Sequence, residues 1–111
     1  MSVQKIHRGF AALVFCIAFV TYLLTTYPSL SFWDCGEFIA TTHSLSVPHA
    51  PGAPFFALYA KVIAILPFVE NYAMRINIVS CFASALTVML VYLIGVIAGL
   101  AFAISVGANS A

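Results

Sequence analysis

Two acidic residues, Asp34 and Glu37, stand three positions apart in a chain that holds only three acids. Residues three apart share a face of a helix, so the two carboxylates would lie together. Pairing carboxylates in partly buried surroundings raises the pKa of one of them, which makes a general base near neutral pH. The alternative is that Asp34 caps a helix and Glu37 is a solvated neighbour near the positive end of its dipole. We interpret the pair as candidate catalytic residues.

A proline-rich segment at 47–54 contains His49 and Gly52. Its three prolines exclude a helix and force extended or turn geometry. Such a backbone could hold the His49 imidazole at a membrane surface, to contact a phosphate or share a proton with a carboxylate. Gly52 allows a conformation that other residues rarely adopt. The alternative is a stiff connector between two helices.

Lys61 places a charge inside an apolar stretch. A charge within a membrane-spanning segment indicates function by default, and this ammonium could neutralise an anionic head group. The alternative is that its long side chain snorkels to the interface. We predict no metal site, because no pair of the three cysteines has zinc-like spacing and two acids alone provide few ligands for a divalent cation.

The composition requires a membrane environment. Of the 111 residues, 64% are hydrophobic and only 6% are charged, whereas soluble domains carry about 25% charged residues. Such a chain cannot cover a water-facing surface and needs lipid around it. The net charge of +1 provides no basic field for nucleic acid.

The apolar segments predict about three membrane-spanning helices, at 9–27, 54–69 and 76–99. Residues 1–8 are basic, which places the N-terminus in the cytoplasm and the loop 28–53 on the exported side by the positive-inside rule. The first segment lacks a small-x-small cleavage site, which favours an uncleaved span over a signal peptide.

A surface amphipathic helix is expected at 32–46 in the exported loop, because Ser31 and Asp34 have the spacing of a capping box. A cytoplasmic turn is expected at 70–75. The uncharged stretch that follows would be about 54 Å long as one helix, so residues 100–111 are expected to turn at a glycine and start a further element. We therefore expect an all-α integral membrane fold, as the N-terminal part of a longer protein.

Two segments, WDCGEFIA at 33–40 and HAPGAP at 49–54, resemble the N-terminal portion of the bacterial protein O-mannosyltransferase-like membrane family. This GT-C-type family was formerly classed as a domain of unknown function. The stretch 75–87 is similar to the third span of the same family. One departure is Ala50, where the family usually has proline.

The resemblance implies an inverting glycosyltransferase. It would move a sugar, with mannose as the candidate, from a polyprenyl-phosphate-linked donor to a protein or glycan hydroxyl at the exported face of the bacterial inner membrane. Asp34 would be the base, and Glu37 would support it or position the acceptor. The residues expected to bind substrate are Trp33, His49, Gly52 and Lys61. The resemblance implies the lipid-linked donor as substrate and assigns no certain cofactor, and the sequence does not say whether a divalent metal is needed. The 111-residue chain alone is expected to be inactive.

Two other classes of function are compatible with these residues. In a transporter or channel segment, Asp34, Glu37 and Lys61 would line an ion path. In a non-catalytic membrane subunit, the exported loop would dock a partner. The acids are expected in a loop helix and not in the middle of a span, which favours the transferase over the ion path.

Overall fold

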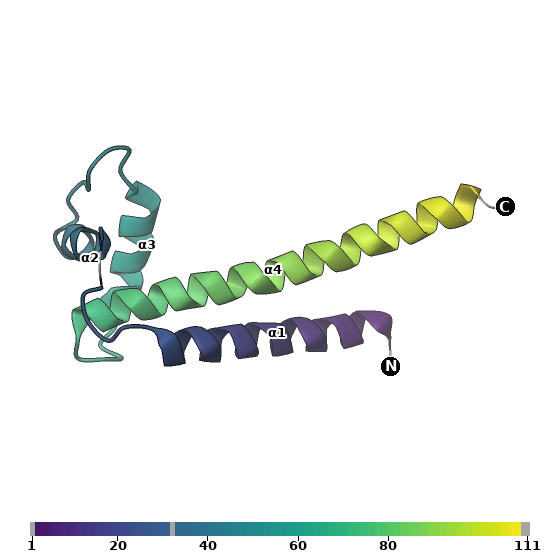
Figure 1. The fold of residues 1–111 in the computed structure, drawn as a ribbon, viewed down its shortest axis with the longest axis horizontal. Coiled ribbons are helices and arrows are strands. Elements are labelled where there is room, and N and C mark those ends of the chain that lie inside the picture. The colour runs from purple at the N-terminus through teal and green to yellow at the C-terminus, as the bar shows by residue number, and fades with distance from the viewer. Residues whose placement is uncertain (1, 32, 110–111) are drawn as a thin grey trace. The chain divides into compact units, whose positions relative to one another are not determined.

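The computed structural model of the chain describes residues 2–31 and 33–109, and all regular structure within them is helical, which confirms the all-α fold class. Figure 1 shows the four helices, which are α1 (Val3–Thr25), α2 (Cys35–Ser44), α3 (Pro54–Ala64) and α4 (Tyr72–Asn109). By length and composition, α1 and α4 could each cross a membrane. The predicted count of three spans is not confirmed.

The second predicted span, 54–69, contains only the short helix α3. Pro54 begins this helix, since its missing N–H group is not needed in the first turn. Eleven residues rise about 16 Å, which is half of the hydrocarbon thickness. Beyond the helix, the Arg75 guanidinium donates to the carbonyl of Ala64 at 3.1 Å and to that of Glu70 at 3.4 Å. These contacts satisfy carbonyl groups that a longer helix would have bonded internally.

The C-terminal stretch forms one continuous helix, without the turn that the sequence predicts at Gly95, Gly99 or Gly107. Residues 100–109 therefore belong to α4, and residues 110–111 lie outside the described residues. A glycine inside a helix costs about 1 kcal/mol relative to alanine. An interrupted helix in lipid would leave backbone N–H and C=O groups without hydrogen bonds, and this costs more free energy than a glycine inside a helix. The continuous helix is therefore the more stable form.

The helix α2 is shorter than the predicted 32–46. Its C-terminal cap, Leu45, has φ of 54° in the left-handed region and donates its N–H to Thr41 O, which ends the helix. Phe32, where the predicted helix begins, lies outside the described residues. The capping box is also not formed, because the N-cap residue is Asp34 and its side chain makes no capping hydrogen bond.

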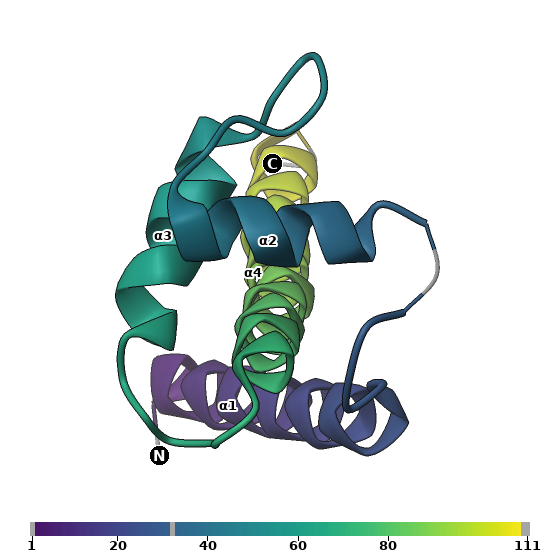
Figure 2. The same cartoon turned by 90° about the vertical axis from the view of Figure 1, so that its left-hand side faces the viewer.

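The chain divides into two units. The first consists of Met1–Tyr22 and Ala83–Ala111, where α1 and α4 run in opposite directions and His7 Nδ1 lies 3.0 Å from the Tyr92 hydroxyl. The second is Leu23–Phe82, in which α2 lies across α3 (Figure 2). The buried residues of the second unit's core come from α2, α3 and the start of α4: Ile39, Ala60, Ala64, Ile76 and Val79.

Within the second unit, the segment after α1 lies against the start of α4. The side-chain amide of Asn71 donates to Pro28 O at 3.3 Å, and that of Asn77 donates to Tyr27 O at 2.8 Å. The sequence predicts residues 70–75 as a turn across the membrane from the exported loop. The side of the membrane on which residues 70–75 lie stays a prediction.

Candidate functional site

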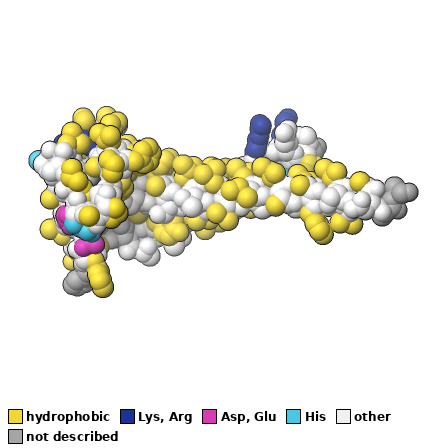
Figure 3. Space-filling view, turned by 90° about the horizontal axis from the view of Figure 1, so that it is seen from above, with side chains coloured by type: hydrophobic (Ala, Val, Ile, Leu, Met, Phe, Trp, Pro, Cys, Tyr) yellow, Lys and Arg dark blue, Asp and Glu magenta, His cyan; other side chains and the backbone are white. Residues whose placement is uncertain are grey.

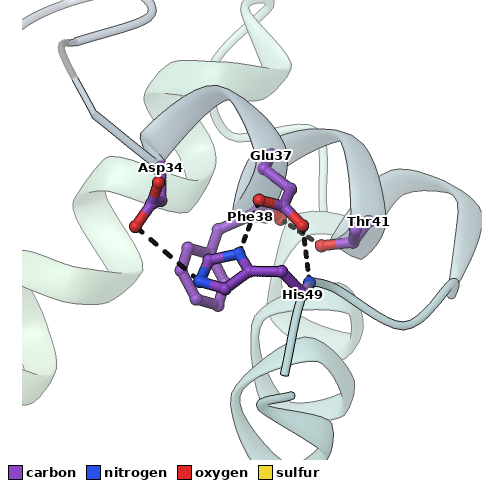
Figure 4. Close-up of polar contacts among 5 residues, drawn as sticks. All are labelled: Asp34, Glu37, Phe38, Thr41 and His49. Carbon is purple, nitrogen blue, oxygen red and sulfur yellow. Dashed lines mark hydrogen bonds and ion pairs between the residues drawn. The ribbon is translucent and has the colours of Figure 1, made fainter. Parts of the chain in front are cut away.

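Glu37 holds His49 against α2 through two hydrogen bonds. The backbone N–H of His49 donates to Glu37 Oε1 at 2.6 Å, and His49 Nδ1 lies 2.7 Å from Oε2. On the other side of the ring, Nε2 lies 3.9 Å from Asp34 Oδ2. The imidazole therefore stands between the two carboxylates (Figure 4). Figure 3 shows acidic side chains and a histidine gathered on one surface among hydrophobic atoms.

The loop between α2 and α3 brings His49 to this position. Gly52 donates its N–H to His49 O at 2.9 Å and has φ of 76°, the left-handed region that glycine adopts without steric cost. The His49 ring packs against Phe38 of α2, with ring centroids 6.3 Å apart. Phe38 in turn packs edge-on against Phe56 of α3, at 5.7 Å. The turn and the aromatic contacts thus fix the imidazole beside the carboxylates.

The contact shifts both pKa values toward the charged forms. The His49 backbone N–H, followed by its side chain, holds the pKa of Glu37 below its ordinary value. The hydrogen bond to Glu37 raises the pKa of His49. The sequence predicts instead that pairing the acids raises the pKa of one carboxyl. The pKa of Glu37 moves in the opposite direction, because the imidazole lies beside the carboxylate and favours its charge.

The Asp34 side chain is not used to build the helix. Its backbone carbonyl accepts the N–H of Phe38 at 3.0 Å, while its carboxylate makes no capping bond. The side chain is 61% exposed and faces His49 and solvent. The alternative that this carboxylate serves as a helix cap is therefore not supported by the geometry. A carboxylate in this state can accept a proton from an incoming group.

Trp33 precedes Asp34 with a conformation that is uncommon for a bulky residue. Its φ is 66° and its side chain is 96% exposed. Backbone outliers of this kind cluster at functional sites. The indole therefore offers an open aromatic face one residue away from the candidate base.

Lys61 lies apart from the carboxylates and His49. Its ammonium donates to His43 O at 2.6 Å, in the last turn of α2, and lies 6.0 Å from the Tyr72 ring centroid. Glu37, six residues before His43, lies about 9 Å away along the helix axis. The cation therefore complements the negative end of the α2 dipole. The sequence suggested that the Lys61 ammonium either binds an anionic head group or extends to the membrane interface. Neither interpretation predicts its hydrogen bond to His43 O.

Asn77 is a residue that the sequence reasoning missed. Its side-chain amide donates to Tyr27 O and to Ser29 O, at 2.8 and 3.1 Å, and Cys35 Sγ lies 3.9 Å from its Oδ1. These contacts join the start of the loop and the first turn of α2 to α4. The available signal was an amide side chain at an otherwise apolar stretch of helix.

Asp34, Glu37 and His49 are the described residues that could hold a metal ion together, since each offers a ligand atom within 4.8 Å of the others. Glu37 and His49 Nδ1 already bond one another, which leaves Asp34 and His49 Nε2 as free donors. Two protein donors are fewer than calcium sites use, whereas magnesium sites take one or two carboxylates together with substrate phosphates. The absence of a metal stays a prediction.

Known proteins resemble this chain over most of its length. The family model of the "Protein O-mannosyl-transferase TMEM260 N-terminal domain" matches residues 34–100, from the candidate base to α4. The chain is 31% identical over 83 residues to "Protein O-mannosyl-transferase tmem260" of Dictyostelium discoideum, and 36% identical over 86 residues to "Protein O-mannosyl-transferase TMEM260" of Mus musculus. These alignments cover 73% and 77% of the chain but only 10% and 12% of the relatives. No solved structure matches the chain.

Proposed function

Because the chain belongs to the family of the protein O-mannosyl-transferase TMEM260 N-terminal domain, we propose that it carries the acid–base part of a membrane glycosyltransferase site. The family match agrees with the resemblance inferred from the motifs. The two relatives come from eukaryotes, and a bacterial origin stays a prediction. The chain spans about a tenth of the length of these relatives, so the remaining parts of the site would come from other segments.

The proposed reaction transfers a sugar from a polyprenyl-phosphate donor to a protein or glycan hydroxyl. Mannose is the candidate sugar, from the relatives' names. Asp34 takes the proton of the acceptor hydroxyl while its oxygen attacks the anomeric carbon. The bond to the lipid phosphate breaks on the opposite face, and the phosphate leaves with the electron pair. The anomeric centre is inverted.

One observation carries this proposal: His49 stands between the two carboxylates while Asp34 remains free of the helix cap. In this arrangement Glu37 orients the imidazole, and Nε2 directs its proton toward Asp34. The exposed face of Trp33 provides a surface for the sugar ring, and the turn at Gly52 keeps His49 in place. We assign Lys61 to holding α2, because its ammonium is engaged at the far end of that helix.

We further propose that the chain crosses the inner membrane twice, through α1 and α4, with its N-terminus in the cytoplasm. Both α2 and α3 would then lie on the exported side, together with residues 70–75. The basic start of the chain supports the orientation. The short length of α3 and the Asn71–Pro28 and Asn77–Tyr27 contacts support the two crossings.

The test is a transfer assay on the protein in its full natural length, in membranes, with labelled polyprenyl-phosphate mannose. Asp34→Asn keeps the size of the side chain and removes the base, so we expect a roughly 10²- to 10⁴-fold loss of transfer at equal expression. Glu70→Gln is the matched control, because Glu70 is the chain's remaining acid and is exposed. Equal loss in both variants, or no loss in Asp34→Asn, would remove Asp34 from the mechanism.

A further inference from the structure

The first unit holds a cavity of about 590 Å³ between the N-terminal turns of α1 and the second half of α4. On the α1 side, Gln4 and Arg8 are four residues apart and share one face of the helix. His7 also lines the cavity, and its contact with the Tyr92 hydroxyl connects the two helices here. This side of the cavity carries polar and basic groups beside the aliphatic side chain of Val3.

The α4 side of the same cavity is aliphatic. Its residues Leu93, Val96, Ile97 and Leu100 follow the i, i+3, i+4, i+7 spacing that places side chains on one helix face. No hydroxyl, amide or charged group comes from this wall. The cavity therefore has one wall from α1 with polar and cationic groups and one apolar wall from α4.

The charge of this unit is unbalanced. The described residues 2–22 and 83–109 include Lys5 and Arg8 and no acidic residue. A guanidinium without a carboxylate nearby can form paired hydrogen bonds to a phosphate group. A free phosphate would satisfy the cation but would leave the aliphatic wall bare. A phosphate that carries an acyl chain would use both sides.

We propose that this cavity binds an anionic phospholipid, with the head group at Gln4 and Arg8 and the first part of an acyl chain along the aliphatic face of α4. Basic pockets between membrane-spanning helices on the cytoplasmic side are typical sites for anionic head groups. The cavity lies at the basic N-terminal end of α1, which the positive-inside rule assigns to that side. The site requires α1 and α4 to span a bilayer, but it does not depend on sugar transfer.

The experiment uses the full chain in nanodiscs of phosphatidylcholine with a minor fraction of phosphatidylglycerol. Native mass spectrometry measures the ratio of the two lipids retained on the protein, relative to the ratio in the bilayer. Lys5→Gln is the matched control for Arg8→Gln. Lys5 is three residues away, carries the same charge, and lines a different surface with Ile6 and Phe10.

We expect phosphatidylglycerol to be enriched on the unmodified chain. Arg8→Gln should lower the enrichment roughly fivefold, from about 1 kcal/mol per basic residue near a membrane surface, while Lys5→Gln changes it less than about twofold. Ile97→Trp, which fills the aliphatic side, should also lower it, and excess inorganic phosphate should not compete.

Three results would overturn the proposal. The first is equal enrichment of both lipids on the unmodified chain. The second is an equal loss for Lys5→Gln and Arg8→Gln, because that pattern indicates diffuse attraction to the bilayer and not a site. The third is displacement of phosphatidylglycerol by free phosphate, because the aliphatic wall would then contribute nothing.

Discussion

Gly52→Ala tests whether the left-handed turn holds the loop of the candidate site. Gly52 has φ of 76°, and a Cβ added there would meet Val47 Cγ1 at 3.6 Å, an ordinary van der Waals contact. The cost is therefore conformational and not steric. A left-handed conformation costs a residue with a Cβ about 1–2 kcal/mol. We expect the free energy of unfolding of the second unit to fall by that amount.

The matched control is Gly36→Ala, the same chemical change at a helical position. Gly36 lies in the first turn of α2, and an added Cβ would be 3.8 Å from Leu30 Cδ2. There alanine should stabilise the unit by about 0.5–1 kcal/mol, because glycine loses more backbone entropy on folding. The two identical substitutions should thus act with opposite signs.

The assay is urea unfolding in micelles, followed by the reaction of the Cys81 thiol, which is 7% exposed in the folded unit. Cys16 and Cys35 are replaced by serine in every variant, so that only this thiol reports. If Gly52→Ala is neutral or stabilising, the turn does not require glycine, and the argument that it fixes His49 fails. A destabilising Gly36→Ala would instead show that the assay responds to any added methyl group.

Two further predictions concern ionisation and topology. Glu37→Gln should return the pKa of His49 from its raised value toward the ordinary value, measured by NMR titration of the ring; an unchanged pKa would contradict the contact. In the unmodified chain, the charged pair forms above the lowered pKa of Glu37 and is lost as pH rises through the raised pKa of His49. For topology, Glu70→Cys and Val47→Cys should react with an impermeant maleimide from the same side of the membrane. If the cysteines at positions 47 and 70 react from opposite sides, the chain between them crosses the membrane, as the sequence predicts for 54–69.

Local sequence signals predicted the position of α1 and the closeness of the two acids, because both depend on neighbouring residues. Hydropathy placed the first span at 9–27, whereas α1 begins six residues earlier, at Val3, and ends two residues earlier, at Thr25. The spacing of the two acids indicated that their carboxylates lie close together. The sequence also suggested that His49 could share a proton with a carboxylate, and the 2.7 Å distance between His49 Nδ1 and Glu37 Oε2 is short enough for this. The motifs also indicated the family that the comparisons later showed.

Features set by distant contacts could not be predicted in the same way. The C-terminal end of α3 depends on the Arg75 guanidinium, which lies eleven residues beyond Ala64. The pKa of Glu37 falls because a loop twelve residues away supplies both hydrogen-bond donors. The partner of Lys61 is a backbone carbonyl, which has no signature in the sequence.

The length of α4 has a consequence for how the protein responds to its bilayer. Residues Tyr72–Phe82 of this helix belong to the second unit, and in the topology proposed above residues 83–109 are the part that crosses the membrane. Those 27 residues are about 40 Å long, while the hydrocarbon layer is about 30 Å thick. The helix matches such a layer when it tilts by about 40° from the normal, at the edge of the range that membrane proteins adopt. In that topology a thicker bilayer would bring the helix more upright, so hydrophobic mismatch would act on α4 itself.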